Sequence, residues 1–336
     1  MVDSKLFQPI RVGNLTLSHR IVLAPVSRYR SRERSHIPYV SIMKEYYAQR
    51  GSDPGTLLIT EATFLSAWKE ITDAVHTEGS FIFCQLWALG RTADYTDLKE
   101  ENPSLNIVAP SAIKLADSLE TPRPLTLDEI KEYPQLFARA AFDIIHKAGF
   151  DGVEIHGVNG YLINQFLQDV SNQRMDEYGG SIKNRALFRL EVLDATGIRL
   201  NPWGTTQDMG MQDPVPTFSY FVSEIKKKHP DLAYLHVVEP RIAVDKLNAS
   251  ESNDFIRRIW APKPLISAGG YTRESAMETA DKKGNIIAFG WYLISNPDLT
   301  VRLKDNIPFT LYDRSTFYLH GEVAEGYIDY PFASEL

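Results

Sequence analysis

Three polar residues, His156, Asn159 and Tyr161, follow a short apolar run in the stretch EIHGVNGYL. A histidine and an asparagine at this spacing could both donate to one substrate carbonyl oxygen and stabilise the enolate charge that develops there. A tyrosine two residues further on could deliver a proton to carbon. The alternative is an ordinary turn whose histidine satisfies a buried hydrogen bond. The place of this stretch in the fold decides between the two interpretations.

Glycines at two other points of the sequence could bind an anion. Gly269 and Gly270 precede Thr272, which opens a helical pattern, and Gly290 follows another apolar run. Bare backbone N–H groups near a helix N-terminus favour a phosphate. Taken alone, these residues could equally be glycines of tight turns.

Gln85 and Arg199 are candidates for binding a flat heterocycle. Gln85 offers both a donor and an acceptor, and Arg199 is a fixed cation that could stabilise negative charge near N1 of a reduced flavin. Each residue alone is more often structural. Together with a phosphate site they favour a planar, phosphate-bearing cofactor across a barrel mouth, and flavin mononucleotide (FMN) fits this description.

The elements that must position these residues alternate along the chain. Eight short β-rich runs are expected as strands, and most are continuously apolar, which is typical of parallel strands covered on both faces. Helical patterns lie between them, and the first begins with a capping box of Thr126 and Glu129. The expected strands are 20–26, 56–63, 81–87, 152–156, 197–202, 233–238, 264–269 and 285–290, and the expected helices are 126–148, 181–195, 217–228, 252–260 and 272–283.

This alternation of strands and helices is compatible with two folds, an open doubly wound sheet and a closed (β/α)8 TIM barrel. Eight units without a second block of different composition favour the barrel, as a single domain over residues 1–336, with a hairpin around Gly13-Asn14 closing the barrel floor. Active sites of such barrels lie at the carboxyl ends of the strands. The candidate residues fall at these carboxyl ends, namely His156, Gln85, Arg199 and the three glycines. The sequence therefore favours a polar site over a structural turn.

Composition excludes several other classes of function. The net charge is −7 and the longest basic run is three lysines, so nucleic acid and anionic membrane surfaces are not expected partners. The single Cys84 lies in an apolar run, and no Cys/His cluster indicates a metal. Because the sequence shows no apolar leader and no run long enough to span a membrane, a cytoplasmic location is expected. The protein is expected to be a monomer or a homodimer.

Nearly the whole chain resembles the old yellow enzyme family of FMN-dependent ene-reductases, in its fungal branch. The motifs that carry the resemblance include HRIVLAPVSRYR, FIFCQLWALGR, AGFDGVEIHGVNGYLINQFLQDVSNQRMDEYGGSIKNR, PLISAGGYTRESA and STFY followed by EGYIDYPF. The resemblance implies a barrel with FMN at its top and NADPH or NADH as the reductant. It also implies hydride transfer through the flavin to the β-carbon of an enone or enal.

The resemblance also assigns residues by position. Pro25, Ser27 and Ala62 would contact the flavin ring, Gln85 and Arg199 its pyrimidine end, and Gly269, Gly270 and Gly290 the phosphate. His156 and Asn159 match the pair that holds the substrate carbonyl, and Tyr161 matches the proton donor. Trp87 and Tyr318 would line the substrate pocket.

Three departures distinguish this chain from the family pattern. Trp291 stands where the pattern has an arginine that pairs with the FMN phosphate, and loss of such a contact costs on the order of 1.5–3 kcal/mol. Residues 64–68 are a shortened form of the loop after the second strand. Residues 194–197 join a helix to the fifth strand with almost no connection.

Three functional hypotheses follow. The first is an ene-reductase that uses FMN and NAD(P)H. The second, motivated by Trp291 and the shortened loop, is a family member with weak or absent FMN binding. It would catalyse a non-redox isomerisation or cyclisation in fungal secondary metabolism. The third, a catalytically silent binding protein, is less favoured because the polar residues are intact.

Overall fold

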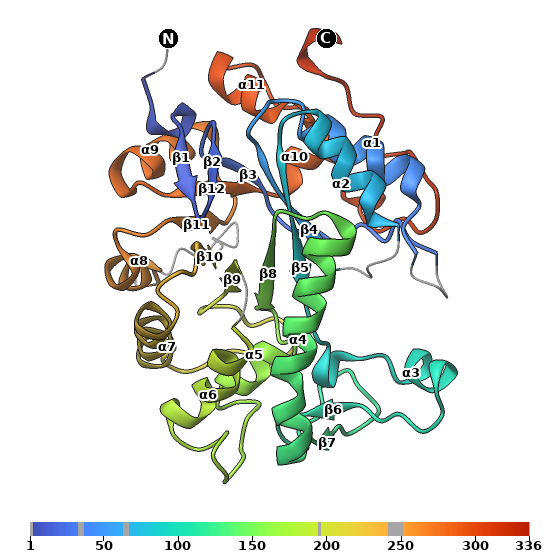
Figure 1. Ribbon diagram of the computed structural model, residues 1–336, viewed down its shortest axis with the longest axis vertical. Coiled ribbons are helices and arrows are strands. Elements are labelled where there is room, and N and C mark those ends of the chain that lie inside the picture. Colours follow the sequence, from blue (N-terminus) through green and yellow to red (C-terminus); the bar gives the residue numbers. More distant parts are fainter. Residues whose placement is uncertain (1–2, 33–36, 63–66, 194–195, 241–250, 336) are drawn as a thin grey trace. The chain divides into compact units, whose positions relative to one another are not determined.

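A computed structural model describes residues 3–32, 37–62, 67–193, 196–240 and 251–335. Eight strands close into a barrel in the order β10-β11-β12-β3-β4-β5-β8-β9, which confirms the predicted (β/α)8 fold (Figure 1). All eight predicted strands are present, and several are shorter than expected. They are β3 (Ile21–Leu23), β4 (Leu57–Ala62), β5 (Phe81–Leu86), β8 (Gly152–Gly157), β9 (Gly197–Leu200), β10 (Tyr234–Val238), β11 (Leu265–Ala268) and β12 (Ile286–Phe289).

All five predicted helices are also present. They are α4 (Leu127–Ala148), α6 (Ile182–Val192), α7 (Val215–Lys228), α8 (Asp254–Trp260) and α9 (Arg273–Lys283). Further helices that the sequence patterns did not indicate are α1 (Val40–Arg50), α2 (Trp68–Thr77), α3 (Tyr95–Glu101), α5 (Leu162–Leu167), α10 (Trp291–Ser295) and α11 (Leu299–Asp305). Of these, α1 has no 3.6-residue apolar repeat, so tertiary packing decides its structure.

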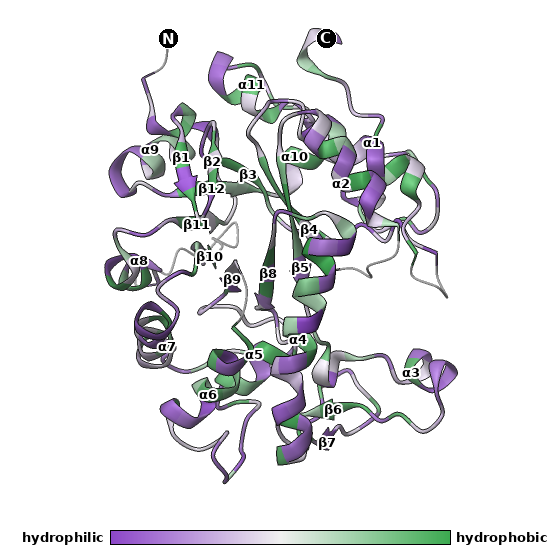
Figure 2. Ribbon diagram, viewed as in Figure 1, coloured by the Kyte–Doolittle hydropathy of each residue, from purple (hydrophilic) through white to green (hydrophobic). Residues whose placement is uncertain are grey.

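Burial explains why the strand sequences are continuously apolar. Every residue of β3, β8, β11 and β12 is buried. In Figure 2 the strands β4 and β5 are largely hydrophobic, whereas α4 carries both hydrophilic and hydrophobic residues. The predicted capping box begins α4, because Glu129 Oε2 accepts from the Thr126 N–H at 2.8 Å and the Glu129 N–H donates to Thr126 Oγ1 at 3.2 Å.

The chain divides into two compact units. The first unit comprises residues 1–85, 141–154 and 264–336. In it, the hairpin of β1 (Ile10–Val12) and β2 (Leu15–Leu17) turns at Gly13, as predicted. The Ser18 N–H after β2 donates to the oxygen of Gly55, just before β4, so the hairpin adjoins the amino ends of the strands.

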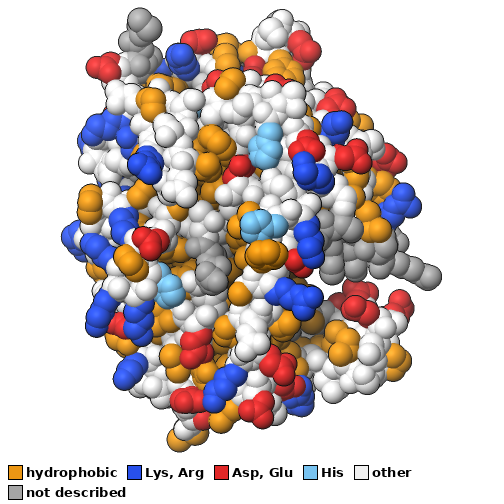
Figure 3. Space-filling view, viewed as in Figure 1, with side chains coloured by type: hydrophobic (Ala, Val, Ile, Leu, Met, Phe, Trp, Pro, Cys, Tyr) orange, Lys and Arg blue, Asp and Glu red, His pale blue; other side chains and the backbone are white. Residues whose placement is uncertain are grey.

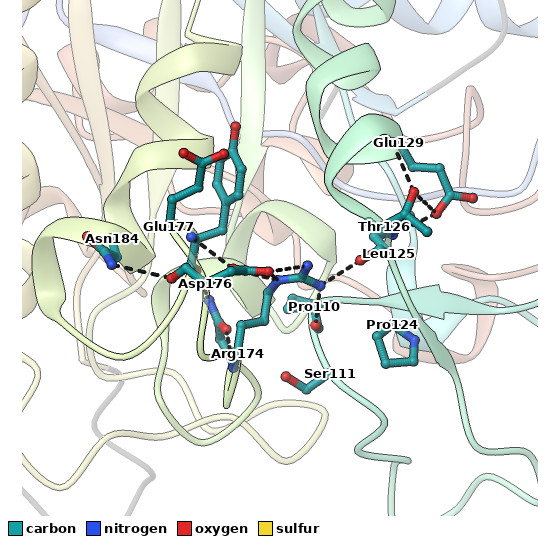
Figure 4. A network of polar contacts seen from close by, with 12 residues as sticks. Pro110, Ser111, Pro124, Leu125, Thr126, Glu129, Arg174, Asp176, Glu177 and Asn184 are labelled. Carbon is teal, nitrogen blue, oxygen red and sulfur yellow. Dashed lines mark hydrogen bonds and ion pairs between the residues drawn. The ribbon is translucent and has the colours of Figure 1, made fainter.

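The second unit comprises residues 86–140 and 155–263. Its short strands β6 (Val108–Ala109) and β7 (Arg123–Pro124) pair with each other. Arg174, in the connection between α5 and α6, donates to the oxygens of Pro110 and Leu125 and forms an ion pair with Asp176 (Figure 4). These contacts fix the segment that follows the predicted site residues.

Parts of the earlier predictions lie outside this description. Residues 64–66 of the first shortened segment (64–68) and residues 194–195 of the second (194–197) are among those that the structure does not describe. The single-domain organisation stays a prediction. No helix in the described ranges combines the length and apolar character that a membrane span requires. On the face that Figure 3 draws, basic and acidic side chains are interspersed.

Candidate active site

The carboxyl end of β8 carries His156, which is only 6% exposed. An added Cβ at Gly157 would lie 2.2 Å from Nη2 of Arg189 and 2.7 Å from the backbone oxygen of Arg199, so this position accepts only glycine. Arg189 donates from Nη2 to the oxygen of Gly157 at 3.0 Å. The contact fixes the strand end next to His156.

The sequence interpretation missed Arg189. It is 1% exposed, its guanidinium lies 4.5 Å from the centre of the Phe221 ring, and burial lowers its pKa to about 9. Its position in a helical pattern resembles that of any surface arginine. Only the long-range contact to Gly157 reveals that it supports the strand end.

The turn after β8 places Asn159 in a left-handed conformation, with φ of 54°. Asparagine tolerates this region better than most residues. Asn159 Oδ1 accepts from Asn201 Nδ2 at 3.4 Å, so its own amide N–H groups are the ones available as donors. Gly160 follows with φ of 77°, and a Cβ there would lie 2.8 Å from Cβ of Gln207. The turn therefore depends on glycine at this second position.

Three aromatic side chains from two segments meet in the second unit. The ring centres of Trp87 and Tyr161 are 4.8 Å apart, those of His156 and Tyr161 are also 4.8 Å apart, and those of Trp87 and His156 are 6.3 Å apart. Trp87 is 38% exposed and Tyr161 is partly exposed. The structure thus brings together three of the predicted site residues and leaves two of them, Trp87 and Tyr161, accessible to solvent. Arg199, on β9, pairs in register with His236 of β10.

In the first unit, Gln85 lies near the carboxyl end of β5, beside a buried carboxylate. Its Nε2 donates to Glu154 Oε1 at 2.7 Å, and the two residues are 3% and 0% exposed. This bond orients the amide and leaves the Gln85 oxygen as an acceptor. Such an oxygen suits the N3–H of a flavin ring, so the residue fits the expected cofactor.

The predicted ring-binding residues lie at the ends of β3 and β4. Ser27 is exposed, Pro25 is buried, and Ala62 pairs in register with Gln85. The Arg28 N–H donates to Glu61 Oε2 at 2.8 Å. Burial raises the pKa of Glu61 to about 7, and this hydrogen bond opposes the shift.

The three predicted phosphate glycines lie on neighbouring strands, because Ala268 of β11 pairs with Ala288 of β12. Gly269 and Gly270 have φ of 156° and 75°, and an added Cβ at Gly270 would have nothing within 4 Å. A Cβ at Gly290 would approach Val26 Cγ2 to 3.2 Å. Exposed backbone and open space at Gly270 fit a phosphate group.

Trp291, the main departure from the family pattern, packs its ring among other aromatic residues. Its ring centre lies 5.3 Å from that of Tyr312 and 6.1 Å from that of Phe317. The guanidinium of Arg314 lies 4.5 Å from the centre of the same ring. These contacts account for the direction of the indole and bring a cation next to it.

Tyr318, expected in the substrate pocket, belongs to a segment that two buried arginines hold. Arg28 Nε donates to the oxygen of Phe317 and Arg30 Nε to that of Val323, both at 3.0 Å. The Tyr318 ring is 49% exposed and its centre lies 5.7 Å from that of Tyr29. Tyr29 and Arg30 were missed, although they follow Ser27 and Arg28 directly in the sequence.

Comparison with known proteins shows the family and the fold of this chain. Residues 5–310 match the model of the NADH:flavin oxidoreductase / NADH oxidase family. The chain belongs to this family. It superposes on the crystal structure of old yellow enzyme from Pichia sp. AKU4542 with a TM-score of 0.88 and 35% identity, covering 100% of this chain and 95% of that one. The likeness to old yellow enzyme that the motifs indicated is therefore confirmed, and the chain is an NAD(P)H-dependent oxidoreductase of the flavin-using type.

Two fungal relatives are more similar in sequence. A chanoclavine-I aldehyde reductase of Penicillium roqueforti is 44% identical over 366 aligned positions, covering 99% of this chain and 97% of the relative. A probable inactive dehydrogenase of Claviceps fusiformis is 40% identical, with coverage of 100% and 96%. The first alignment is longer than the 336 residues of this chain, so the relative carries residues that this family member lacks.

Proposed function

We propose that this family member is an FMN-dependent ene-reductase of fungal secondary metabolism, acting on a small or medium α,β-unsaturated aldehyde or ketone. Bound FMN would supply the redox chemistry, which is the transfer of hydride from NADPH or NADH to the β-carbon of the substrate. The observation that carries the proposal is the contact of Trp87, His156 and Tyr161 next to the turn of Asn159. The two residues that would hold a carbonyl and the one that would donate a proton lie within one compact unit.

His156 and Asn159 hold the substrate carbonyl oxygen in this proposal. When hydride adds to the β-carbon, the electron pair of the C=C bond moves toward that oxygen, and an enolate forms. Hydrogen-bond donors that are already oriented stabilise this charge without reorganisation. The His156 ring is nearly buried, and Asn159 keeps its N–H groups for a ligand because Asn201 uses its oxygen.

Tyr161 completes the reduction by donating its phenolic proton to the α-carbon, and solvent restores the proton. The residue begins α5 as its N-cap, so its backbone is fixed while its side chain stays partly exposed. The edge contact with Trp87 sets the direction of the ring. A side chain with this combination of order and access suits proton transfer.

Tyr161→Phe tests this role because it removes only the hydroxyl. Stopped-flow absorbance of the flavin follows reduction by NADPH and reoxidation by 2-cyclohexenone separately. We expect reoxidation to slow about a hundredfold or more and reduction to stay within about twofold of the wild type. Tyr95→Phe, at an exposed tyrosine of the same unit, serves as the control. An equal loss in both half-reactions would remove Tyr161 from the donor role.

The second candidate function is a non-redox isomerisation or cyclisation by a protein with little or no bound FMN. Trp291 in place of the family arginine and a 40%-identical relative named as a probable inactive dehydrogenase favour it. The absorption spectrum of the purified protein after incubation with FMN separates the two candidates. A bound-flavin band that NADPH bleaches without oxygen supports the reductase. A colourless protein that still converts an enone or polyene supports the isomerase or cyclase.

A further inference from the structure

The segment that follows α11 brings an arginine onto the residue after Gly290. Arg314 begins the short 3-10 helix η3 (Arg314–Thr316), and its guanidinium carbon lies 4.5 Å from the centre of the Trp291 ring. Trp291 directly follows Gly290, the glycine that ends β12. A positive charge therefore lies against the side chain that stands where the family pattern has its own arginine, although the charge comes from a residue 23 positions later.

Arg314 has its hydrogen-bond donors available for a ligand. The side chain is exposed, and in the described part of the chain no carboxylate forms an ion pair with it. The neighbouring Asp313 carboxylate accepts from the N–H of Ser315 at 2.9 Å and from its hydroxyl at 2.7 Å, so Asp313 is engaged within its own turn. A guanidinium stacked on an aromatic face keeps the N–H groups at its edge free to bind an anion.

The segment that presents Arg314 is firmly held. Phe317 is completely buried, and Arg28 Nε donates to its backbone oxygen. The Thr316 hydroxyl donates to the oxygen of Asp313 at 2.9 Å, which closes the turn. Contacts between the rings of Trp291, Tyr312 and Phe317 then join this segment to the end of β12. The position of the arginine is thus set by packing and not by the charge of Arg314 itself.

The neighbouring glycines provide the other half of an anion site. Gly270 has a left-handed backbone and open space where a side chain would be, and it leads into α9, an eleven-residue helix capped by Thr272. Backbone N–H groups and the positive end of a helix attract a phosphate. A cation on the ring of Trp291, the residue after Gly290, would add the charge that these groups lack.

We propose that Arg314, held against the face of Trp291, is the residue that binds the phosphate of FMN in this chain. Trp291 then acts as the platform that positions Arg314 and is not simply a lost phosphate ligand. The inference rests on the proposed use of FMN. It adds a residue from outside the barrel strands to the cofactor site.

The test compares FMN with riboflavin, which has the same ring system without the phosphate. Apoprotein is titrated into each flavin, and binding is followed by quenching of flavin fluorescence. For Arg314→Ala we expect the dissociation constant of FMN to rise ten- to a hundredfold and that of riboflavin to stay within about twofold. Arg314→Lys should recover part of the loss, because it keeps the charge. Trp291→Leu should weaken the binding of FMN by a smaller factor, because it removes only the ring that positions Arg314.

Arg11→Ala, at an exposed arginine of the N-terminal hairpin, is the matched control and should change neither affinity. The proposal fails if Arg314→Ala weakens the binding of FMN and riboflavin equally, or changes the affinity for neither. It also fails if the wild type binds riboflavin as tightly as FMN, although flavin use by the enzyme would then stand. A wild type that binds neither flavin would overturn the proposed reductase function together with the role of Arg314.

Discussion

The carboxyl ends of β8 and β12 both present groups suited to a ligand, but they are built differently. At β8, His156, Asn159 and Tyr161 lie within six consecutive positions, and a buried arginine anchors the strand end through Gly157. At β12, Gly290 and Trp291 follow the strand, and the charge on the Trp291 ring comes from Arg314 in a distant segment. A site built from consecutive residues can be recognised from spacing, whereas a site completed by a distant segment requires the fold.

The largest expected effect concerns the β8 end. Replacing both His156 and Asn159 by alanine removes the donors proposed to stabilise the enolate, and we expect reoxidation of the flavin by 2-cyclohexenone to fall about 10²- to 10³-fold. FMN affinity and reduction by NADPH should stay close to wild type, because these residues are proposed to act on the substrate carbonyl. Stopped-flow absorbance and flavin titration measure the three quantities. If the double variant also binds FMN more weakly, the assignment of the β8 end to the substrate and of the β12 end to the cofactor is wrong.

A second prediction compares glycines at the two kinds of strand end. Gly157→Ala forces a Cβ against Arg189 and the backbone of Arg199, and the backbone cannot move aside easily. We expect it to lower the free energy of unfolding by about 3 kcal/mol or more, at the upper end of the usual range for overpacking. Gly270→Ala meets open space and only the strain of a positive φ, for which about 1–2 kcal/mol is expected. Urea unfolding of both variants measures the difference, and similar losses would contradict the account of Gly157.

Much of the fold could be predicted because its signals are local. Short β-rich runs, most of them continuously apolar, marked all eight barrel strands, and the capping box of Thr126 and Glu129 marked the start of α4. The helices that were missed show why such patterns have limits. The apolar residues of α1 form no regular stripe, yet Tyr46, Tyr47 and other residues on it are buried by neighbouring elements. Tertiary packing, and not sequence periodicity, determines that helix.

The candidate site divides in the same way. Spacing and resemblance identified His156, Asn159 and Tyr161, and the structure places two of their rings in contact with each other and with Trp87. Neither spacing nor resemblance could identify Arg189 or Arg314, because each acts across a long sequence separation. Their sequence neighbours give no indication of the partner, so only the folded chain shows which strand end each arginine supports.

The smallest expected effect concerns Glu61, at the end of β4 in the same unit as β12. Burial raises its pKa to about 7, above the value of about 4.5 for an exposed glutamate. Between these two pH values the folded chain holds a proton that the unfolded chain has lost. The stability that Glu61 contributes is therefore complete below pH 4.5 and is lost as the pH rises through 7. Because the Glu61 side chain is partly exposed, we expect the free energy of unfolding to fall by roughly 2 kcal/mol over this pH range.

Glu61→Gln isolates this effect, because the glutamine oxygen can still accept from the Arg28 N–H and the side chain no longer titrates. The free energy of unfolding in urea, measured at pH 5 and pH 8, should fall further in the wild type than in the variant. His156→Gln, at the β8 end, provides the comparison and should leave the Glu61 contribution unchanged. An equal pH dependence in the wild type and Glu61→Gln would mean that Glu61 is ionised throughout. The end of β4 would then carry a charged side chain over this pH range, as the β8 end does through Arg189.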